Sequence, residues 1–267
     1  MTLNKAKNSV EKDPVLAEKD QFIIKLAENE QEIEDACRLR YRVFKLERGN
    51  GVNDTAAAGI DRDDFDDVCK HLVIIEKNTR KVVGTYRMQF GSDAMRLKGF
   101  YSGTEYDLSG INKIASQAIE VGRSCVDPEY RSGSVVSLLW AGIAEIMLRT
   151  KMMYLLGCVS LEEVDYSLGW ALSEYFKCKG LNSDIVLGKA KQDYVLPEGD
   201  EERIRELLDD ERQLRKALPP LLKGYIRLGA HVCGEPALDR DFGTIDYLIC
   251  LNLSNLPKRY QKHYLEK

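Results

Sequence analysis

The sequence predicts an α/β protein in which helices cover both faces of a mixed central sheet. Two β-branched runs within residues 71–90 are separated by a short polar segment, which is the pattern of a β-hairpin. After this hairpin, strand-like and helix-like segments alternate along the chain. One helix-like segment, residues 132–150, is apolar nearly all round and is therefore expected in the interior. Together these observations favour a sheet with helices on each side.

The composition excludes several classes of protein. With 267 residues the chain can bury a full core. An apolar share of 44% beside 31% charged residues is typical of a globular protein and not of a disordered or fibrous one. The net charge of −4 gives no global footprint for nucleic acid. No apolar run approaches the roughly 20 residues of a membrane span, and the N-terminus lacks a signal-peptide core, so we predict a cytoplasmic protein.

The cysteine and histidine patterns predict no metal site. No pair of cysteines has C-x-x-C spacing, and the three histidines lie far apart in the sequence. The cysteines are odd in number and mostly lie in apolar runs, which fits small buried side chains in a reducing compartment. They are Cys37, Cys69, Cys125, Cys158, Cys178, Cys233 and Cys250.

We expect a single folded domain over residues 21–267. Residues 1–20 are charged and lack periodicity, so they are expected to form a flexible tail. Residues at about 190–217 are highly charged with few apolar anchors and are expected to form a helical excursion from the main core. At the C-terminus, Lys258, Arg259 and Lys262 form either a solvated end or a contact with an acidic partner or anionic lipid.

The first helix is predicted to begin at Gln31, where apolar residues start to recur with helical spacing. That spacing places Arg40 on the apolar stripe. Two interpretations remain open. Either the stem of Arg40 is buried while its head lies in water, or the guanidinium points inward and holds a carboxylate or phosphate.

A loop rich in Gly, Asn and Ala is predicted over residues 49–59. It is followed by DRDDFDDV at 61–68, which contains five acidic residues. Such a cluster is most often solvated surface. The alternative is a site for a cation, either a substrate ammonium or an interior arginine.

The later elements alternate regularly after one long loop. Residues 91–117 form that loop, which is either a functional lid or disordered. The predicted strands are 118–126, 152–161, 183–188 and 243–253, and the predicted helices are 132–150, 165–181 and one that begins at the proline pair 219–220.

Two charges interrupt the otherwise apolar strand 118–126. Glu120 and Arg123 are three residues apart, so a regular strand directs them to opposite faces, whereas a bulge would bring them together. Burying both is costly unless each has a partner, so they either pair with other interior residues or serve a function. We predict one polar network of Arg40, Arg87, Arg123, Glu120 and the acidic cluster at 61–67.

The loop Glu129–Ser134 leads into the helix at 132–150. It offers the free backbone N–H groups of a helix start beside small side chains, a geometry that suits an anion such as phosphate. A helix cap alone also explains a Ser-Gly start.

The segment RSCVDPEYRSGSVVSLLW, residues 123–140, resembles the acyl-donor-binding strand, loop and helix of GCN5-related N-acyltransferases (GNAT). The resemblance implies the GNAT fold for residues 21–267 and loop amides that hold the phosphates or phosphopantetheine of an acyl donor. The donor-binding residues that it implies are Cys125, Val126, Arg131, Ser132, Gly133, Ser134 and Val135.

A closer resemblance is to the haemolysin-like, acyl-ACP-dependent ornithine N-acyltransferases of ornithine lipid synthesis. It covers about residues 22–265, and its most specific block is PPLLKGYIRLGAHVCGEPALDRDFGTIDYLICL at 219–251. The other blocks are LRYRVF (39–44), DRDDFDDVCKHL (61–72), VVGTYRM (82–88), AIEVGRSCVDPEYR (118–131) and LLGCVSLE (155–162).

The same blocks are similar to acyl-homoserine lactone synthases. In such enzymes the matching residues shape the acceptor side and its ion-pair network. Carried over one by one, they fall on Arg40 and Phe44, on Asp63 and Asp66, on Arg87, and on Glu120 and Arg123. The tyrosine that often protonates the leaving thiolate in GNAT enzymes is replaced by Phe176, and Tyr175 precedes it.

The resemblance implies transfer of a (3-hydroxy) fatty acyl group to the α-amine of an amino acid, with ornithine as the first candidate. Acyl-ACP or acyl-CoA is the co-substrate, no bound cofactor is expected, and the partners are acyl carrier protein and, peripherally, the cytoplasmic membrane face. Glu120 is the candidate base, the arginines grip the acceptor carboxylate or brace the acidic cluster, and Asp63 and Asp66 receive a cationic side chain. Two alternatives are an acyl-homoserine lactone synthase and a non-catalytic acyl-carrier or membrane-binding protein.

Overall fold

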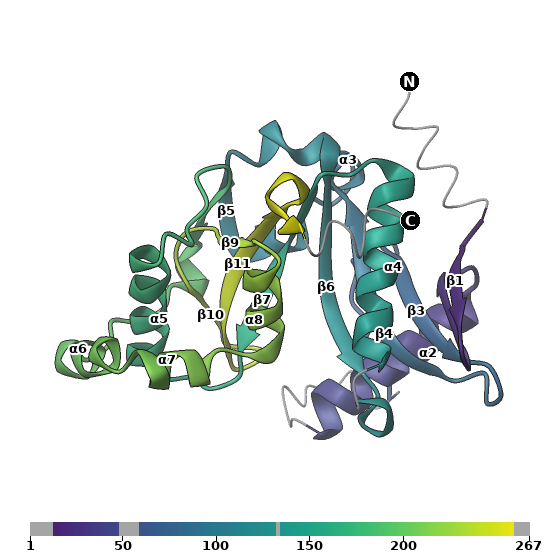
Figure 1. Ribbon diagram of the computed structural model, residues 1–267, viewed down its shortest axis with the longest axis horizontal. Coiled ribbons are helices and arrows are strands. Elements are labelled where there is room, and N and C mark those ends of the chain that lie inside the picture. Colours follow the sequence, from purple (N-terminus) through teal and green to yellow (C-terminus); the bar gives the residue numbers. More distant parts are fainter. Residues whose placement is uncertain (1–12, 48–58, 132–133, 259–267) are drawn as a thin grey trace.

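A nine-stranded mixed sheet forms the centre of the protein, in the order β1-β2-β3-β4-β6-β7-β11-β10, with β9 paired to β11 (Figure 1). The computed structural model describes residues 13–47, 59–131 and 134–258. Neighbouring strands are antiparallel except β6 and β7, which are parallel. The strands are β1 (Val15–Lys19), β2 (Phe22–Leu26), β3 (Lys70–Glu76), β4 (Val82–Phe90), β6 (Ala118–Val126), β7 (Tyr154–Leu161), β9 (His231–Val232), β10 (Ala237–Asp239) and β11 (Thr244–Asn252).

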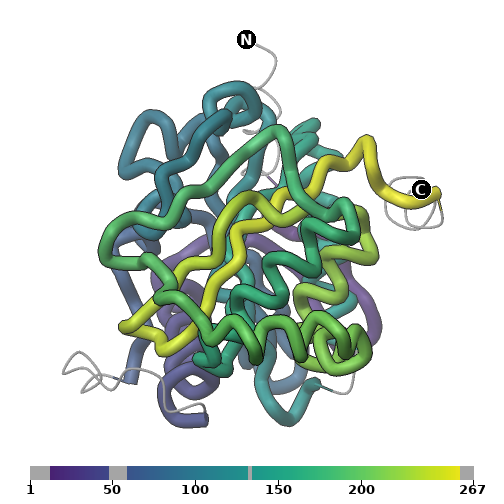
Figure 2. Tube along the Cα trace, turned by 90° about the vertical axis from the view of Figure 1, so that its left-hand side faces the viewer, coloured from purple at the N-terminus to yellow at the C-terminus, as the bar shows by residue number. Residues whose placement is uncertain are grey.

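Helices lie on both faces of this sheet, as the sequence predicted. Alternate residues of β3 show the two layers: Leu72 and Ile74 pack into the core that contains α4, and Val73 and Ile75 pack into the core that contains α2. Figure 2 shows the side of the molecule formed by the C-terminal half of the chain, where α5–α8 lie near β11. The helices are α2 (Glu30–Arg40), α3 (Gly91–Ala94), α4 (Ser134–Thr150), α5 (Tyr166–Cys178), α6 (Glu201–Asp209), α7 (Glu211–Ala217) and α8 (Pro220–Arg227).

Local sequence signals fix the helix starts. Asn29 caps α2, Asp165 caps α5 and Asp200 caps α6, because each side chain accepts a backbone N–H of the first turn. A proline occupies the first turn of α8, where its missing N–H costs no hydrogen bond. Beyond α2 the chain continues as a π-helical turn, Tyr41–Glu47, of the kind that often occurs at functional sites.

The prediction of a tail through residue 20 is wrong for its second half. Val15–Lys19 form β1, which pairs with β2 and contributes the buried Leu16 to the core. The charged composition of residues 1–20 gave no sign of this edge strand, which is anchored by the burial of Leu16. The first twelve residues and the predicted loop at 49–59, except Gly59, lie outside the described residues.

The segment 91–117 is ordered, not a disordered loop. It contains α3, a 3-10 turn at Tyr101–Thr104 and β5 (Tyr106–Ser109), which pairs with β8 (Leu187–Ala190) in a second, two-stranded sheet. Strand β8 begins later than the predicted 183–188, because the Ser183 hydroxyl accepts the N–H groups of Ile185 and Val186 and holds a turn there. The charged excursion at 190–217 contains α6 and α7, which bury Leu207 and Leu214.

The parallel strands β6 and β7 separate early. They pair from Ala118 and Tyr154 to Glu120 and Leu156, and then diverge (Figure 1). At the point of divergence, a Cβ on Gly157 would lie 2.2 Å from the carbonyl oxygen of Val121. A glycine is required there because the two backbones approach so closely.

We expect Gly157→Ala to destabilise the fold by about 2 kcal/mol or more, since β7 must shift to relieve the overlap. The measurement is the free energy of unfolding in urea. The matched control is Gly122→Ala on the neighbouring strand, where a Cβ meets nothing within 4 Å, and we expect it to change stability by less than about 1 kcal/mol. Equal effects of the two substitutions would contradict the proposed contact.

Candidate active site

A cavity of about 680 Å³ occupies the opening between β6 and β7. Its volume is within the range of small-molecule sites. The walls include Val121–Val126 of β6, Gly157–Ser160 of β7, one face of the first half of α4, and the start of α8. Strands β4, β10 and β11 contribute further lining residues, so side chains from distant parts of the sequence meet here.

A β-bulge brings Glu120 and Arg123 to the same cavity. Opposite β4, the register steps from Arg87↔Gly122 to Thr85↔Cys125, which leaves one extra residue on β6. Arg123 takes up this bulge with a positive φ of 50°, a conformation that is strained for a side chain of this size. Both Glu120 and Arg123 therefore line the cavity, whereas a regular strand would separate them.

Glu120 is buried and held by three donors. The backbone N–H of Tyr101 donates to Oε2 at 2.6 Å, and the backbone N–H and hydroxyl of Ser102 donate to Oε1 at 2.8 and 2.6 Å. Burial raises the pKa of Glu120 above its ordinary value, although the Ser102 and Tyr101 donors oppose the shift. The 3-10 turn that provides these donors belongs to the segment predicted as a lid or disordered loop.

Arg40 points inward and binds two aspartates. Its Nε donates to Asp61 Oδ2 at 2.8 Å, and its Nη1 and Nη2 donate to Asp66 Oδ1 and Oδ2 at 2.6 and 2.9 Å. The side chains of Arg40 and Asp66 are 1% and 0% exposed, so the arginine head does not lie in water. This bidentate pair joins α2 to the segment at 61–68.

Two further arginines complete the ion-pair network. Arg87 on β4 donates to Asp63 Oδ1 at 2.5 Å and to Asp66 Oδ1 at 3.3 Å. Arg123 donates to Asp63 Oδ2 at 3.1 Å. Asp63 and Asp66 thus face arginines of the chain itself. The network joins the three predicted arginines to the acidic cluster, while Glu120 lies beside it and binds the Tyr101–Thr104 turn instead.

The arginines also lower the pKa values of the network aspartates. Burial alone would raise the pKa of Asp66, but the hydrogen bonds and charge of Arg40 hold it far below the ordinary range. Burial opposes the charges of Arg87 and Arg123 at Asp63 in the same way, and its pKa is also lowered. Both carboxylates are therefore charged and compensated at neutral pH. Arg40, Asp63 and Asp66 are outside the lining of the cavity and brace its wall from behind.

Two aromatic rings that sequence reasoning did not select enclose Arg123. Its guanidinium carbon lies 4.8 Å from the centre of the Tyr101 ring and 4.6 Å from that of Phe242. Its Nη1 also donates to the Tyr101 hydroxyl at 3.2 Å. Arg123 Nε is buried and has no hydrogen-bond partner among the described residues, and Asp61 Oδ2 lies 3.9 Å from it. Arg123 as a residue nevertheless lines the cavity.

The predicted donor-side residues lie at the lower end of β6 and the start of α4 in Figure 1. Cys125, Val126 and Arg131 line the cavity, together with Phe44 of the π-helical turn. Arg131 forms a bidentate ion pair with Glu47 at 2.5 and 2.7 Å and donates from Nε to the Val126 carbonyl. Val135 is buried and Ser134 exposed at the first turn of α4, and Ser132 and Gly133 lie outside the described residues.

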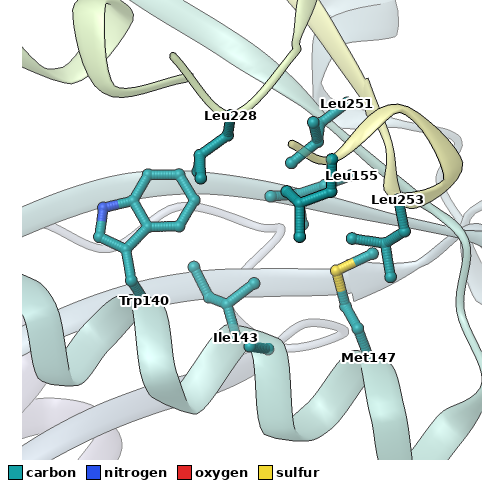
Figure 3. A pocket seen from close by; sticks show the side chains of 9 residues that line it. Trp140, Ile143, Met147, Leu155, Leu228, Leu251 and Leu253 are labelled. Carbon is teal, nitrogen blue, oxygen red and sulfur yellow. The ribbon is translucent and has the colours of Figure 1, made fainter. Parts of the chain in front are cut away.

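Two other features lie away from this chemistry. Phe176 is fully buried in the core and Tyr175 receives a hydrogen bond from Arg215, and neither lines the cavity. A cavity of about 30 Å³ lies between α4 and the end of β11, where Trp140, Met147 and Leu251 point toward one another (Figure 3). Its apolar lining marks a gap in packing.

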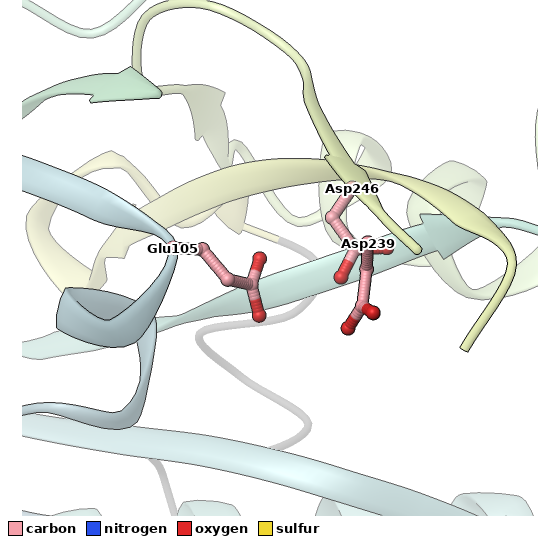
Figure 4. A group of neighbouring side chains, drawn as sticks. All are labelled: Glu105, Asp239 and Asp246. Carbon is pink, nitrogen blue, oxygen red and sulfur yellow. The ribbon is translucent and has the colours of Figure 1, made fainter. Parts of the chain in front are cut away.

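A second acidic cluster was missed. Glu105, Asp239 and Asp246 are buried, and one carboxylate oxygen of each lies within 4.8 Å of the others (Figure 4). Asp239 and Asp246 line the cavity. A recognisable signal was present, since ALDRDFGTID contains three aspartates, and Asp239 and Asp246 lie on either side of its Asp-Phe-Gly turn. The histidine and cysteine spacing on which the metal prediction relied carries no information about such carboxylates.

Comparisons with known proteins agree with the predicted fold. Residues 39–141 match the family model of an acetyltransferase (GNAT) domain. The sequence is 34% identical over 252 residues to an L-ornithine N(alpha)-acyltransferase of Agrobacterium fabrum (strain C58 / ATCC 33970), covering 90% of this chain and 84% of that protein. It is 31% identical over 252 residues to the L-ornithine N(alpha)-acyltransferase of Brucella abortus (strain 2308), covering 90% and 88%. The solved AHL synthase LasI has a TM-score of 0.49 at 14% identity, covering 92% of this chain and 95% of that one.

The GNAT match confirms the predicted fold class. Among the described residues, no helix has both the length and the apolar character needed to span a bilayer.

We expect Arg40→Gln to destabilise the protein by about 3 kcal/mol or more at pH 7, because it leaves the buried charge of Asp66 short of its main partner. The matched control is Arg38→Gln, which removes a surface ion pair with Glu34 on the same helix and should cost less than about 1 kcal/mol. Urea unfolding measures both.

The difference in the free energy of unfolding between the wild type and Arg40→Gln should become smaller as the pH falls from 7 towards about 4. In the wild type the lowered pKa of Asp66 contributes stability that is fully present above its unfolded-state pKa of about 4 and is lost only at lower pH, so the narrowing between pH 7 and 4 comes from the variant. In the variant, Asp66 is buried without Arg40, which favours its protonated form. Lowering the pH therefore removes the uncompensated charge and reduces the destabilisation. A difference that stays constant with pH would show that Arg40 acts by packing alone.

Proposed function

Because the chain belongs to the family of L-ornithine N(alpha)-acyltransferases, we propose that it transfers a fatty acyl group from a phosphopantetheine thioester to the α-amine of an amino acid. Ornithine is the first candidate for the acceptor and acyl-ACP for the donor, with acyl-CoA as the alternative donor. A (3-hydroxy) fatty acyl group would give a lyso-ornithine-type lipid.

One observation carries the proposal at the level of chemistry: Glu120 and Arg123 open onto the same cavity. A carboxylate whose pKa is raised by burial is suited to take a proton near neutral pH. An arginine that lines the same cavity is suited to bind the carboxylate of an amino acid. The buried amide of Gln89, which also lines the cavity and has no partner among the described residues, offers a further polar contact.

In the proposed reaction the α-ammonium of the acceptor first gives a proton to Glu120, directly or through a water molecule. The free amine then attacks the thioester carbonyl, the C–N bond forms, and the C–S bond breaks. The thiolate of phosphopantetheine leaves with the C–S electron pair. The attacking nitrogen loses its second proton as the amide forms, and this balances the proton that the thiolate takes up. A backbone N–H near Cys125 or Val126 is proposed to stabilise the oxyanion, so these residues act through the main chain. No covalent acyl-enzyme is required, and Cys125 is assigned to packing.

The arginines of the network divide by position. Arg123 lines the cavity and is proposed to bind the acceptor carboxylate, whereas Arg40 is buried behind the wall and acts as a positioning residue. Arg87 belongs to both groups, because it lines the cavity and also pairs with Asp63. We therefore assign Asp63 and Asp66 to holding these arginines.

The donor side is proposed at the start of α4. There the phosphopantetheine would lie near Arg131 and the first helical turn that contains Ser134 and Val135, and the predicted contacts of Ser132 and Gly133 belong to the same proposal. Phosphate binding at Arg131 has to compete with Glu47, which now holds its guanidinium. We propose acyl carrier protein as the partner, a cytoplasmic reaction, and a peripheral contact with the cytoplasmic membrane face that receives the lipid product.

The proposed function predicts a new lipid in cells that express the protein. Mass spectrometry of lipid extracts should detect an N-acyl amino acid, and its fragmentation names the acceptor. The Glu120→Gln strain is the matched comparison. If neither strain contains such a lipid and purified enzyme releases no thiol from acyl-ACP with any amino acid, a non-catalytic binding role replaces the proposal.

Glu120→Gln is also expected to lower kcat by about 100-fold or more while the fold stays intact, because the amide keeps the shape but cannot accept a proton. In the wild type, kcat should fall as the pH drops through the raised pKa of Glu120, since protonation removes the base. The variant should lack this acid limb. Thiol release from acyl-ACP measures the rate, and Glu129→Gln, an exposed glutamate in the following loop, serves as the control. Normal turnover in Glu120→Gln would exclude it as the base.

A further inference from the structure

The second acidic cluster has the geometry of one site. In the β10–β11 ladder Asp239 pairs with Thr244 and Ala237 pairs with Asp246, so the two aspartates share one face of the sheet. Glu105 extends toward them from the turn before β5 (Figure 4). The aspartates are held in place, since Asp239 Oδ1 accepts the N–H groups of Asp241 and Phe242 at 2.9 Å and Asp246 Oδ1 accepts the Thr244 hydroxyl at 2.9 Å.

Glu105 lacks the partner that a buried carboxylate needs. It is 1% exposed, and neither of its oxygens accepts a hydrogen bond within the described part of the chain. The group beside it is the thiol of Cys158, a weak donor. In the described residues no lysine, arginine or histidine forms an ion pair with Glu105, Asp239 or Asp246. Among the described residues, the charge of Arg123 acts on Glu105 and Asp246 without forming an ion pair with them. Buried carboxyl groups without a donor or a paired cation are costly, so the cluster is suited to bind a further positive charge.

Two of the three carboxylates share the cavity of Glu120, whereas Glu105 lies outside its lining and contributes through its closeness to them. Asp239, Asp246 and Cys158 line that cavity. Burial raises the pKa of the Cys158 thiol, and the charges of Glu105, Asp246 and Glu120 add to the shift, so Cys158 is within electrostatic reach of both acidic groups. An acceptor whose α-amine is near Glu120 therefore shares its cavity with Asp239 and Asp246.

The first acidic cluster does not offer such a site. Asp66 has no exposed side-chain surface, and Arg40 and Arg87 occupy its oxygens. Asp63 is shared between Arg87 and Arg123. An added ammonium would have to displace an arginine from these aspartates.

We propose that Glu105, Asp239 and Asp246 bind the side-chain ammonium of the acceptor and so select a basic amino acid over a neutral one. The inference rests on the proposed function and names the specificity-determining residues of that site. Three oxygens within 4.8 Å of one another suit the three hydrogens of one ammonium, because hydrogen bonds of about 2.8 Å at tetrahedral angles end about 4.6 Å apart.

Electrostatics give this selectivity a pH dependence. Burial and the charges of Asp246 and Asp239 raise the pKa of Glu105 to about 9, and burial raises that of Asp246 to about 6. Glu105 thus holds a proton at neutral pH, and an incoming ammonium competes with that proton. The other titratable groups that face the cluster are Arg123, Cys158, Tyr101, Tyr106 and Tyr194.

The test compares ornithine with norvaline, which has the same carbon chain without the terminal ammonium. Purified full-length enzyme is assayed with long-chain acyl-ACP, and kcat/KM is measured for both acceptors by thiol release. In Glu105→Gln we expect the preference for ornithine over norvaline to fall by about 10-fold or more. The matched control is Asp107→Asn, an exposed acid two residues away on β5, which should change the preference by less than about 2-fold.

A measurement on the wild type covers the case in which Glu105→Gln does not fold. The preference for ornithine should rise between about pH 5.5 and 8.5, because the cluster loses protons while the ornithine side chain stays charged. Titration of Glu120 cancels in this ratio, since both acceptors need the same base.

The remaining outcomes separate the two proposals. If the wild type acylates neither amino acid, the proposed function fails and takes this inference with it. If it acylates ornithine, but the preference is unchanged in Glu105→Gln and does not vary with pH, the cation site is overturned and the proposed function stands. A preference that is lost in Asp63→Asn but kept in Glu105→Gln assigns the ammonium to the first cluster. A preference that EDTA abolishes and Mg²⁺ restores assigns the second cluster to a metal ion.

Discussion

The bidentate pair between Arg40 and Asp66 is the interaction on which the rest of the site depends. It is almost completely buried, so it persists only because both charges are satisfied, Asp66 by two arginines and Arg40 by two aspartates. Through Asp66 and Asp63 it fixes the segment at 61–68 against α2, β4 and the bulge of β6. Arg87 and Arg123 are positioned by the same carboxylates, and Arg123 in turn contacts Tyr101, whose turn holds Glu120.

The sequence was sufficient for the main architecture and for half of the site. The hairpin, strands β6, β7 and β11 and helices α4 and α5 could be predicted because their apolar patterns are long and regular. The arginine–aspartate network was also predicted, since charges in apolar segments need partners. Strands β1, β2, β5, β9 and β10 were missed because each has five residues or fewer, so that pairing with a neighbour decides its conformation.

The other half of the site depends on contacts that no local pattern reveals. Glu105 lies more than a hundred residues from Asp239 and Asp246, and only the packing of the Tyr101–Ser109 region beside β11 brings them together. Tyr101 and Phe242 enclose Arg123 for the same reason. Even the bulge, which the spacing of Glu120 and Arg123 made conceivable, needed the register against β4 to be established.

The two acidic clusters differ in how their charge is balanced. This difference indicates a structural role for the first cluster and a role in acceptor specificity for the second. In the first cluster Asp61, Asp63 and Asp66 face Arg40, Arg87 and Arg123, so the charges cancel within the fold. In the second cluster three carboxyl groups are buried without an ion pair to any described residue, and the raised pKa of Glu105 keeps it protonated at neutral pH. Stability does not explain this arrangement, because apolar residues of similar size would cost less. The position of this cluster beside the reaction cavity fits a charge that arrives with the substrate. We therefore attribute the proposed preference for a basic acceptor to the carboxyl groups of the second cluster, which form no ion pair with the described residues.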